Sequence, residues 1–92
     1  MFHYVYMLIS LNKKKHISYV GYSLNPKKRL IMHNKGIGAK FTRGKKWKII
    51  FKKKFLNKND ALKFEYSLKK NIKLRKKIKE KFINEHSNNR QR

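Results

Sequence analysis

The sequence predicts an α+β fold: a small three-stranded antiparallel sheet flanked by helices, in the order β-β-α-β-α-α. Segments 2–9, 16–23 and 47–55 are rich in aromatic and β-branched residues, as strands are. Helix-start signals follow the second and the third of these segments. With 92 residues, the chain has room for one small domain and for no large internal cavity.

The first strand, 2–9, carries apolar side chains at both alternating sets of positions. Because the side chains of a strand alternate between two faces, both faces of this strand can pack, which is typical of a central strand. The polar run 12–15 then predicts a hairpin loop that leads to the second strand, 16–23.

Asn25-Pro26 predicts the start of the first helix, since Asn caps helices and Pro fits the first helical position. The helix should run to about Asn34 and end at Lys35-Gly36. The following stretch, 35–46, contains three glycines and several basic residues, and it predicts a mobile cationic loop.

Segment 57–60 predicts a cap for a second helix that begins at Ala61. A third helical segment, 73–84, either continues this helix or follows a kink near Asn71. The polar end, 85–92, predicts a disordered tail.

The charge of the chain points to a polyanionic partner. Lys and Arg number 27 against 4 Asp and Glu, which gives a formal net charge of +23. Phosphates that such side chains neutralise release counterions, so nucleic acid is the expected partner. The alternative is compositional drift in an AT-rich coding sequence, which explains why Lys outnumbers Arg but not why acids are so few.

The composition also excludes several classes of protein. Without cysteine the chain has no disulfide framework, no thiolate zinc site and no cysteine nucleophile, and a reducing cytoplasm is the expected location. The longest apolar run, 4–9, is far shorter than the roughly 18 residues of a membrane span. It also precedes the basic cluster 13–15, the reverse of a secretory signal, so we expect no association with a membrane.

Glu65 stands out on the second helix. Four apolar residues at helical spacing form a stripe that should face the sheet: Ala61, Phe64, Leu68 and Ile72. Glu65 falls inside this stripe, and an inward carboxylate is costly unless it is paired or binds a cation. The alternatives are an ordinary ion pair with a lysine, or a stripe rotated so that Glu65 reaches solvent.

Arg29 and His33 are spaced i, i+4 on the first helix, so they share a face and can engage one anion together. The planar fork of Arg29 suits a phosphate, in a chain that elsewhere prefers Lys. The alternatives are a solvated basic face for Arg29 and a satisfied or solvent-facing side chain for His33.

Tyr6 and Tyr19 lie on the two hairpin strands, and Gly21 follows Tyr19 by two residues. A glycine at this place allows another backbone or a substrate to come close. Nearby cations can lower a phenol pKa from about 10, which makes a phenolate a candidate general base. The alternative is that both tyrosines are core residues and that Gly21 forms a bulge.

Taken in order, these positions resemble the GIY-YIG nuclease superfamily, in particular its small stand-alone bacterial single-domain type. The match covers about residues 2–83, within a predicted domain of 1–84. Either tripeptide motif alone is weak, but the ordered set is specific. The matching segments are Tyr4-Val5-Tyr6, Tyr19-Val20-Gly21, Lys28-Arg29-Leu30, His33-Asn34, Gly38 to Gly44, and Asp60-Ala61-Leu62 followed by Glu65 and Leu68-Lys69.

The sequence departs from the family pattern in two places that matter. Tyr4-Val5 replaces Gly and Ile in the first tripeptide, so Tyr6 alone carries that motif. Val20 for Ile in the second tripeptide is conservative. Phe41 stands where this group has Tyr, so any role of a hydroxyl there is absent from this chain.

The resemblance implies metal-dependent hydrolysis of DNA phosphodiester bonds, with little sequence specificity, by in-line attack of water. Glu65 would be the only protein ligand of a Mg²⁺ or Mn²⁺ ion. Tyr19 would be the general base, and Arg29 would offset the charge that develops on the phosphorane oxygens. Tyr6 and His33 would orient Tyr19 and the phosphate, with His33 passing the proton onward.

The resemblance also implies a DNA interface that grips phosphates without reading bases, as in DNA repair or recombination, with a monomer favoured. The residues predicted for this interface are Gly21, Lys28, Lys40, Thr42, Arg43, Lys45 and Lys46. The alternative function is a non-catalytic basic DNA- or RNA-binding protein on the same fold, which needs charge but not Glu65. Binding to anionic lipid is a weaker alternative, because neither helix places its aromatic residues opposite a lysine face.

Overall fold

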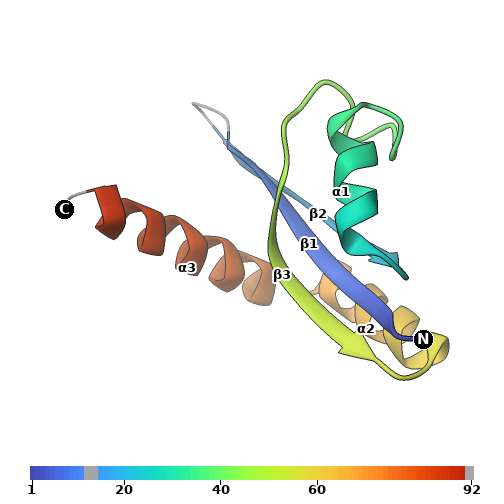
Figure 1. Ribbon diagram of the computed structural model, residues 1–92. Helices are drawn as coiled ribbons and strands as arrows, with labels where there is room; N and C mark the ends of the chain where they lie inside the picture. The colour runs from blue at the N-terminus through green and yellow to red at the C-terminus, as the bar shows by residue number, and fades with distance from the viewer. Residues whose placement is uncertain (12–14, 91–92) are drawn as a thin grey trace.

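The computed structural model describes residues 1–11 and 15–90, and it confirms the predicted α+β architecture and element order (Figure 1). The strands are β1 (His3–Leu11), β2 (His16–Ser23) and β3 (Lys48–Phe55). The helices are α1 (Pro26–Asn34), α2 (Lys58–Lys70) and α3 (Ile72–Arg90). Residues 12–14 of the predicted hairpin loop lie outside the described residues.

The three strands form one antiparallel sheet in the order β2-β1-β3, so β1 is the central strand, as its two apolar faces predict. Tyr6 of β1 pairs with Gly21 on β2 and with Lys52 on β3. These three residues therefore form one row across the sheet. A register shift on the β3 side follows Met7.

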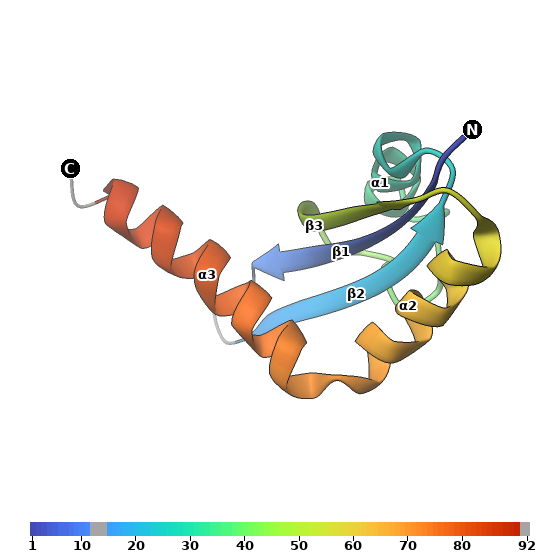
Figure 2. The same ribbon diagram turned by 90° about the horizontal axis from the view of Figure 1, so that it is seen from below.

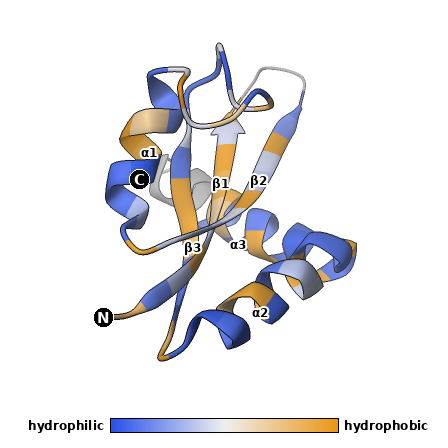
Figure 3. Ribbon diagram, turned by 90° about the vertical axis from the view of Figure 1, so that its right-hand side faces the viewer, coloured by the Kyte–Doolittle hydropathy of each residue, from blue (hydrophilic) through white to orange (hydrophobic). Residues whose placement is uncertain are grey.

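Helices cover both faces of the sheet, α1 on one face and α2 with α3 on the other (Figure 2). On the face covered by α2 and α3, the buried cluster consists of Val5, Met7, Val20, Ala61 and Leu68. On the face covered by α1, it consists of Tyr6, Leu8 and Trp47. Successive residues of β1 thus belong to different clusters, as strand alternation requires, and Figure 3 shows the apolar stretches along the strands.

Both ends of α1 carry the predicted caps. The side chain of Asn25 accepts a hydrogen bond of 3.2 Å from the backbone of the first turn. At the other end Gly36 has a φ of 82°, a value that favours glycine. The Gly36 N–H donates to the His33 carbonyl at 3.1 Å and the Ile37 N–H donates to the Met32 carbonyl at 3.0 Å, which is the Schellman pattern of a helix end.

The second helix starts earlier than predicted. α2 begins at Lys58 rather than at Ala61, because Asn57 is itself the N-cap residue. The Asn57 side chain accepts a hydrogen bond from the Asp60 N–H at 2.8 Å. Segment 57–60 is therefore the cap together with the first turn, rather than a cap alone.

Asn71 separates α2 from α3, at the predicted kink. It closes α2, and its side chain accepts a hydrogen bond from the Leu74 N–H at 3.0 Å, which caps α3. Ile72 is 70% exposed, so the predicted apolar stripe ends at Leu68. α3 continues beyond the predicted end at Asn84 to Arg90, since no Gly or Pro interrupts this segment. No helix in the described part of the chain is long and apolar enough to cross a membrane.

Loop 35–46, predicted to be a mobile cationic loop, is a series of turns held by hydrogen bonds. The Thr42 N–H donates to the Ala39 carbonyl at 3.2 Å. The Trp47 indole N–H donates to the Thr42 carbonyl at 3.0 Å. The loop is therefore fixed to the start of β3, and Figure 1 shows it at the C-terminal end of α1.

β3 is an edge strand with three consecutive lysines, 52–54. The Lys52 ammonium lies over the Tyr4 ring at 5.6 Å, and the Lys54 ammonium lies over the Phe2 ring at 4.3 Å. These cation–π contacts hold two positive charges on the same sheet face as Tyr4 and Tyr6.

Candidate active site

Tyr6 is the centre of the candidate site. Its ring is buried in the cluster under α1, at 1% exposure, and its hydroxyl lies 2.9 Å from His33 Nε2. Burial raises the pKa of Tyr6 above its ordinary value; the nearby Arg29 cation opposes this shift, and Tyr19 and Glu65 add to it. Tyr6 is therefore a neutral phenol with a defined hydrogen-bond partner.

His33 lies in the last turn of α1 and is fully buried. Its second ring nitrogen, Nδ1, lies 2.9 Å from the Thr42 hydroxyl. Burial lowers the pKa of His33, and the positive charge of Arg29 lowers it further. Both ring nitrogens have partners inside the protein, so in this structure His33 has no free nitrogen with which to bind an anion together with Arg29.

Two glycines make room for this pair. A Cβ on Gly21 would lie 2.5 Å from the Tyr6 hydroxyl, and a Cβ on Gly38 would lie 2.3 Å from His33 Nδ1. Both distances are far inside van der Waals contact. Gly21 therefore allows the close approach that the sequence predicts, and the group that comes close is the Tyr6 side chain. Gly21 lies in the regular pairing of β1 with β2, so it does not form a bulge.

Arg29 is held beside the Tyr6–His33 pair by the loop. Its Nη2 donates to the Gly38 carbonyl at 3.1 Å, and its Nη1 lies 3.7 Å from the Met32 sulfur. A guanidinium has five N–H donors, so these contacts leave donors for a phosphate. The Arg29 charge acts on both members of the pair, so the cation is close to both rings.

Tyr19 belongs to an aromatic group next to the pair. Its ring centroid lies 5.0 Å from that of His33 and 6.3 Å from that of Phe41, on which it stacks. Trp47 packs against the Tyr19 ring from the side, with centroids 6.5 Å apart. The Tyr19 ring is only partly buried, so it lies nearer to solvent than Tyr6.

Glu65 approaches the site from α2. Its side chain is 18% exposed, and its Oε2 lies 3.4 Å from Lys69 Nζ, one turn along the same helix. The ion pair considered as an alternative is thus present, but the Lys69 side chain is 53% exposed. Burial is the main cause of the raised pKa of Tyr6, and the charge of Glu65 contributes to it, which places the carboxylate within electrostatic reach of the phenol.

Comparison with known proteins decides the family. Residues 2–79 match the family model described as the GIY-YIG catalytic domain. The chain belongs to the GIY-YIG family. This is a nuclease family, and its domain implies binding to nucleic acid.

Several relatives share most of the GIY-YIG domain. A UPF0213 protein of Oceanobacillus iheyensis is 43% identical over 68 residues, which cover 73% of this chain and 76% of that protein. A UPF0213 protein of Streptococcus pneumoniae is 35% identical over 86 residues, 92% of this chain and 83% of that protein. The solution NMR structure of a UPF0213 protein from Bacillus halodurans is 31% identical, with a TM-score of 0.46 over 84% of this chain and 80% of that chain. These names state no activity.

GIY-YIG nucleases generally use a divalent metal, and the donors near Tyr6 fit one. Within 1–11 and 15–90, no three His, Cys, Asp or Glu side chains gather as a metal cage. A hard cation such as Mg²⁺ needs only one or two carboxylates when water and phosphate oxygens complete its shell. Glu65 is the carboxylate predicted to hold the ion, and its ion-pair partner Lys69 is 53% exposed.

The residues predicted to contact DNA separate into two groups in this GIY-YIG domain. Lys28, Lys40, Arg43 and Lys46 are exposed, and Lys45 is partly buried, with its Nζ donating to the Phe41 carbonyl at 3.3 Å. Gly21 and Thr42 are buried. Thr42 therefore cannot act as a DNA contact in this structure, and its hydroxyl faces His33 instead.

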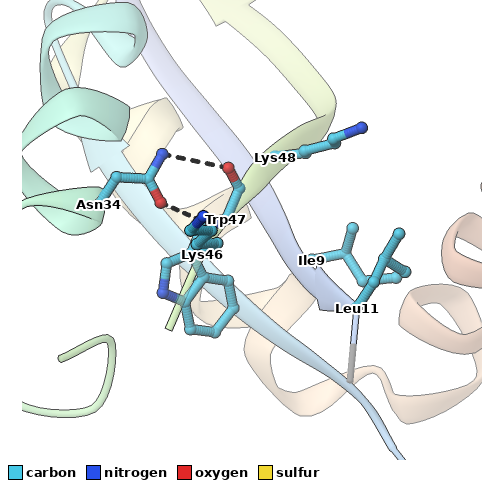
Figure 4. Close-up of a pocket in the computed structure, with 6 residues that line it drawn as sticks. All are labelled: Ile9, Leu11, Asn34, Lys46, Trp47 and Lys48. Carbon is cyan, nitrogen blue, oxygen red and sulfur yellow. Dashed lines mark hydrogen bonds between the residues drawn. The ribbon is translucent and has the colours of Figure 1, made fainter. Parts of the chain in front are cut away.

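The sequence analysis missed two residues that shape the site. The Asn34 side chain accepts a hydrogen bond from the Trp47 N–H at 2.6 Å and donates to the Trp47 carbonyl at 3.2 Å, so it ties the end of α1 to the start of β3 (Figure 4). The pocket drawn there is lined by these two residues with Ile9, Leu11, Lys46 and Lys48. The oxygen and the nitrogen of the Asn34 amide are both hydrogen-bonded to the Trp47 backbone, so we assign the pocket no ligand. The sequence analysis named Asn34 only as part of the matching segment His33-Asn34 and gave it no role at the site.

Proposed function

We propose that this protein is a metal-dependent DNA endonuclease that hydrolyses phosphodiester bonds with little sequence specificity. The observation that carries the proposal is the buried hydrogen bond of 2.9 Å between Tyr6 and His33, with the charges of Arg29 and Glu65 acting on Tyr6. A phenol paired with a neutral imidazole, a fixed cation and a carboxylate for a metal are the parts that phosphodiester hydrolysis uses.

The hydrogen bonds favour Tyr6 over Tyr19 as the general base. The Tyr6 hydroxyl touches His33 Nε2, whereas the Tyr19 ring packs on His33 without a hydrogen bond from its hydroxyl in the described part of the chain. As a water oxygen attacks phosphorus, the water proton passes to Tyr6 Oη and the phenol proton passes to His33 Nε2. His33 Nε2 lies 2.9 Å from the Tyr6 hydroxyl, so a proton that Tyr6 releases can pass directly to His33.

Arg29 and Glu65 then have separate roles. Arg29, anchored on the Gly38 carbonyl, offsets the negative charge that grows on the phosphate oxygens as the bond to the leaving oxygen breaks. Glu65 would hold Mg²⁺ or Mn²⁺, which when bound supplies Lewis-acid polarisation of the phosphate. Removal of one such electrostatic contact typically costs about 2.7–4 kcal/mol of barrier.

DNA would be bound through its backbone by the exposed basic side chains of α1 and loop 35–46. Lys28, Lys40, Arg43 and Lys46 are exposed there, and they follow or precede the residues that enclose His33. Contacts of this kind position the duplex but do not read sequence. We propose a cytoplasmic protein that acts as a monomer, in DNA repair or recombination.

The test is incubation of the pure protein with labelled duplex, branched, flapped and single-stranded DNA, in Mg²⁺, in Mn²⁺ and with a chelator. Cleavage of at least one substrate that requires the metal supports the proposal and names the preferred DNA structure. If the protein binds these DNAs but cuts none of them with either metal, the non-catalytic binding function replaces the nuclease.

A further inference from the structure

The Thr42 hydroxyl makes two short contacts in the interior of the protein. Thr42 is 0% exposed, and its Oγ1 lies 3.0 Å from the Ala39 carbonyl oxygen and 2.9 Å from His33 Nδ1. A hydroxyl has one hydrogen and two acceptor lone pairs. A carbonyl oxygen can only accept, and two oxygens at this distance repel unless a hydrogen lies between them. The Thr42 hydrogen therefore points at Ala39.

This direction fixes the state of His33. With its hydrogen given to Ala39, Thr42 presents a lone pair to His33, so Nδ1 must carry a hydrogen. A neutral imidazole carries one N–H, which leaves Nε2 as an acceptor. The Tyr6 hydroxyl, 2.9 Å from Nε2, is then the donor. The opposite tautomer would leave the contact between Thr42 and Ala39 without a hydrogen.

The surroundings of His33 disfavour the doubly protonated ring. Four charged or titratable groups act on His33 or on its partner: Tyr6 from β1, Tyr19 from β2, Arg29 from α1 itself and, through Tyr6, Glu65 from α2. Burial lowers the pKa of His33, and Arg29 lowers it further. Within residues 1–11 and 15–90, no carboxylate is hydrogen-bonded to either ring nitrogen, since the partners are Tyr6 and Thr42.

We propose that Thr42 is a positioning residue of the nuclease site: its hydroxyl holds His33 as the Nδ1–H tautomer, so that Nε2 can take the proton of Tyr6. The inference rests on the proposed function only for its effect on cleavage, because the tautomer is a property of the free protein.

The loop is built to keep Thr42 in place. The Thr42 carbonyl accepts a hydrogen bond from the Trp47 indole at 3.0 Å, and Trp47 is bound at its backbone by Asn34. Gly38 lacks the Cβ that would strike His33 Nδ1. Trp47 thus fixes the position of Thr42, and Gly38 leaves the space that the His33 ring occupies. Removal of the hydrogen-bond partners that orient metal-ligating residues typically changes metal affinity or activity about 10–100-fold, and we expect an effect on this scale for the partner that orients His33.

The first test is the nitrogen NMR spectrum of the His33 imidazole in the wild-type protein near neutral pH, assigned with His33→Gln. We expect Nδ1 to carry hydrogen and Nε2 to be unprotonated. A ring protonated at Nε2, alone or together with Nδ1, overturns the inference. This measurement needs no DNA and no metal, so it stands even if the protein cuts nothing and the nuclease proposal fails.

The second test compares Thr42→Val, which keeps the shape, with Thr42→Ser, which keeps the hydroxyl. Thr42→Val should lower kcat at least about tenfold with little change in KM for DNA, and it should remove the preference for Nδ1–H. Thr42→Ser should restore both. A Thr42→Val protein that keeps wild-type kcat and tautomer overturns the inference, and so does a folded Thr42→Ser protein that lacks the tautomer. If Thr42→Val does not fold, the wild-type and Thr42→Ser spectra decide.

Discussion

The two faces of the sheet are built from alternate residues of one strand, yet they are made of different chemistry. On the α2 face, Val5 and Met7 of β1 pack with Ala61 and Leu68, all apolar. On the α1 face, the neighbouring Tyr6 meets buried polar groups, and no buried side-chain polar atom of the described residues lacks a partner. Because side chains alternate along β1, the residues that stabilise the fold lie on one face of the sheet and most residues of the candidate site lie on the other. Glu65 is the one candidate residue that comes from α2.

The largest effect should come from Glu65, the residue that links the two faces. Glu65→Gln keeps the shape and removes the charge that would hold the metal, so metal-dependent cleavage should fall below detection at ordinary Mg²⁺ concentrations. Binding to DNA without metal should be unchanged or slightly tighter. The matched control is Lys69→Gln, which removes the ion-pair partner and should still cleave. Cleavage by Glu65→Gln at the wild-type rate would end the catalytic role of Glu65.

Leu68→Ala tests the apolar face on the same helix. Leu68 is 1% exposed in the cluster under α2, so its truncation should cost about 2–5 kcal/mol of the free energy of unfolding. Cleavage well below the melting temperature should stay near the wild-type rate. Chemical denaturation and cleavage measured on the same preparation check both parts, and a variant of normal stability that cleaves slowly would contradict the separation of the two faces.

Comparison of Tyr6→Phe with Tyr19→Phe distinguishes which of the two phenols on the α1 face is the general base. Loss of a general base typically costs about a hundredfold or more in kcat. We expect this loss for Tyr6→Phe, because Tyr6 carries the hydrogen bond to His33, and a smaller loss for Tyr19→Phe. Single-turnover cleavage measures both. The reverse order would return the base role to Tyr19, as the sequence alone suggested.

His33 should make the stability of the α1 face depend on pH. Burial, and then Arg29, lowers the pKa of His33 in the fold, so the unfolded chain takes up this proton first as the pH falls below about 6.5. The corresponding stability is present above that pH and is lost below it, by at most about 1.4 kcal/mol per pH unit. Melting temperatures measured between neutral and acid pH should therefore fall with decreasing pH more steeply for the wild type than for His33→Gln. His16→Gln, at an exposed position, should keep the wild-type slope.

The smallest effect concerns single lysines at the DNA interface. Contacts to about six phosphates would give a slope near −5 for the logarithm of the binding constant against that of salt. Lys40 lies in the loop next to the α1 face, and Lys40→Gln should make this slope shallower by about 0.9. Lys76 lies on α3, and Lys76→Gln should leave the slope unchanged. Both residues are exposed. Equal reductions would show that binding is spread over the whole molecule.

Much of the fold could be predicted because it depends on local patterns. The two apolar faces of segment 2–9 predicted a central strand, and Asn25-Pro26 predicted the start of α1. Boundaries were less certain where one side chain serves two elements: Asn71 both closes α2 and caps α3. Ile72 fits the helical stripe in spacing, but the break at Asn71 turns it to solvent.

The candidate site was predictable in its members but not in their connections. Spacing placed Arg29 and His33 on one helix face, yet only the folded loop shows that Thr42 and Tyr6 occupy both nitrogens of His33. Thr42 was predicted as a DNA contact in the basic loop, but its hydroxyl faces His33. Hydrogen bonds between residues far apart in sequence leave no periodic signal, so the sequence predicted Tyr19 as the base without showing that the hydroxyl bonded to His33 is that of Tyr6.

The lysines of β3 also bear on how copies of the chain meet one another. The outer edge of β3 exposes backbone groups to which another strand could pair, and edges of this kind favour aggregation unless charges guard them. A second copy at this edge would bring two rows of 52–54 face to face, so the free protein should resist self-association. A polyanion that neutralises these charges removes the same protection. Solubility should therefore be lowest near the DNA ratio at which the net charge of +23 is cancelled.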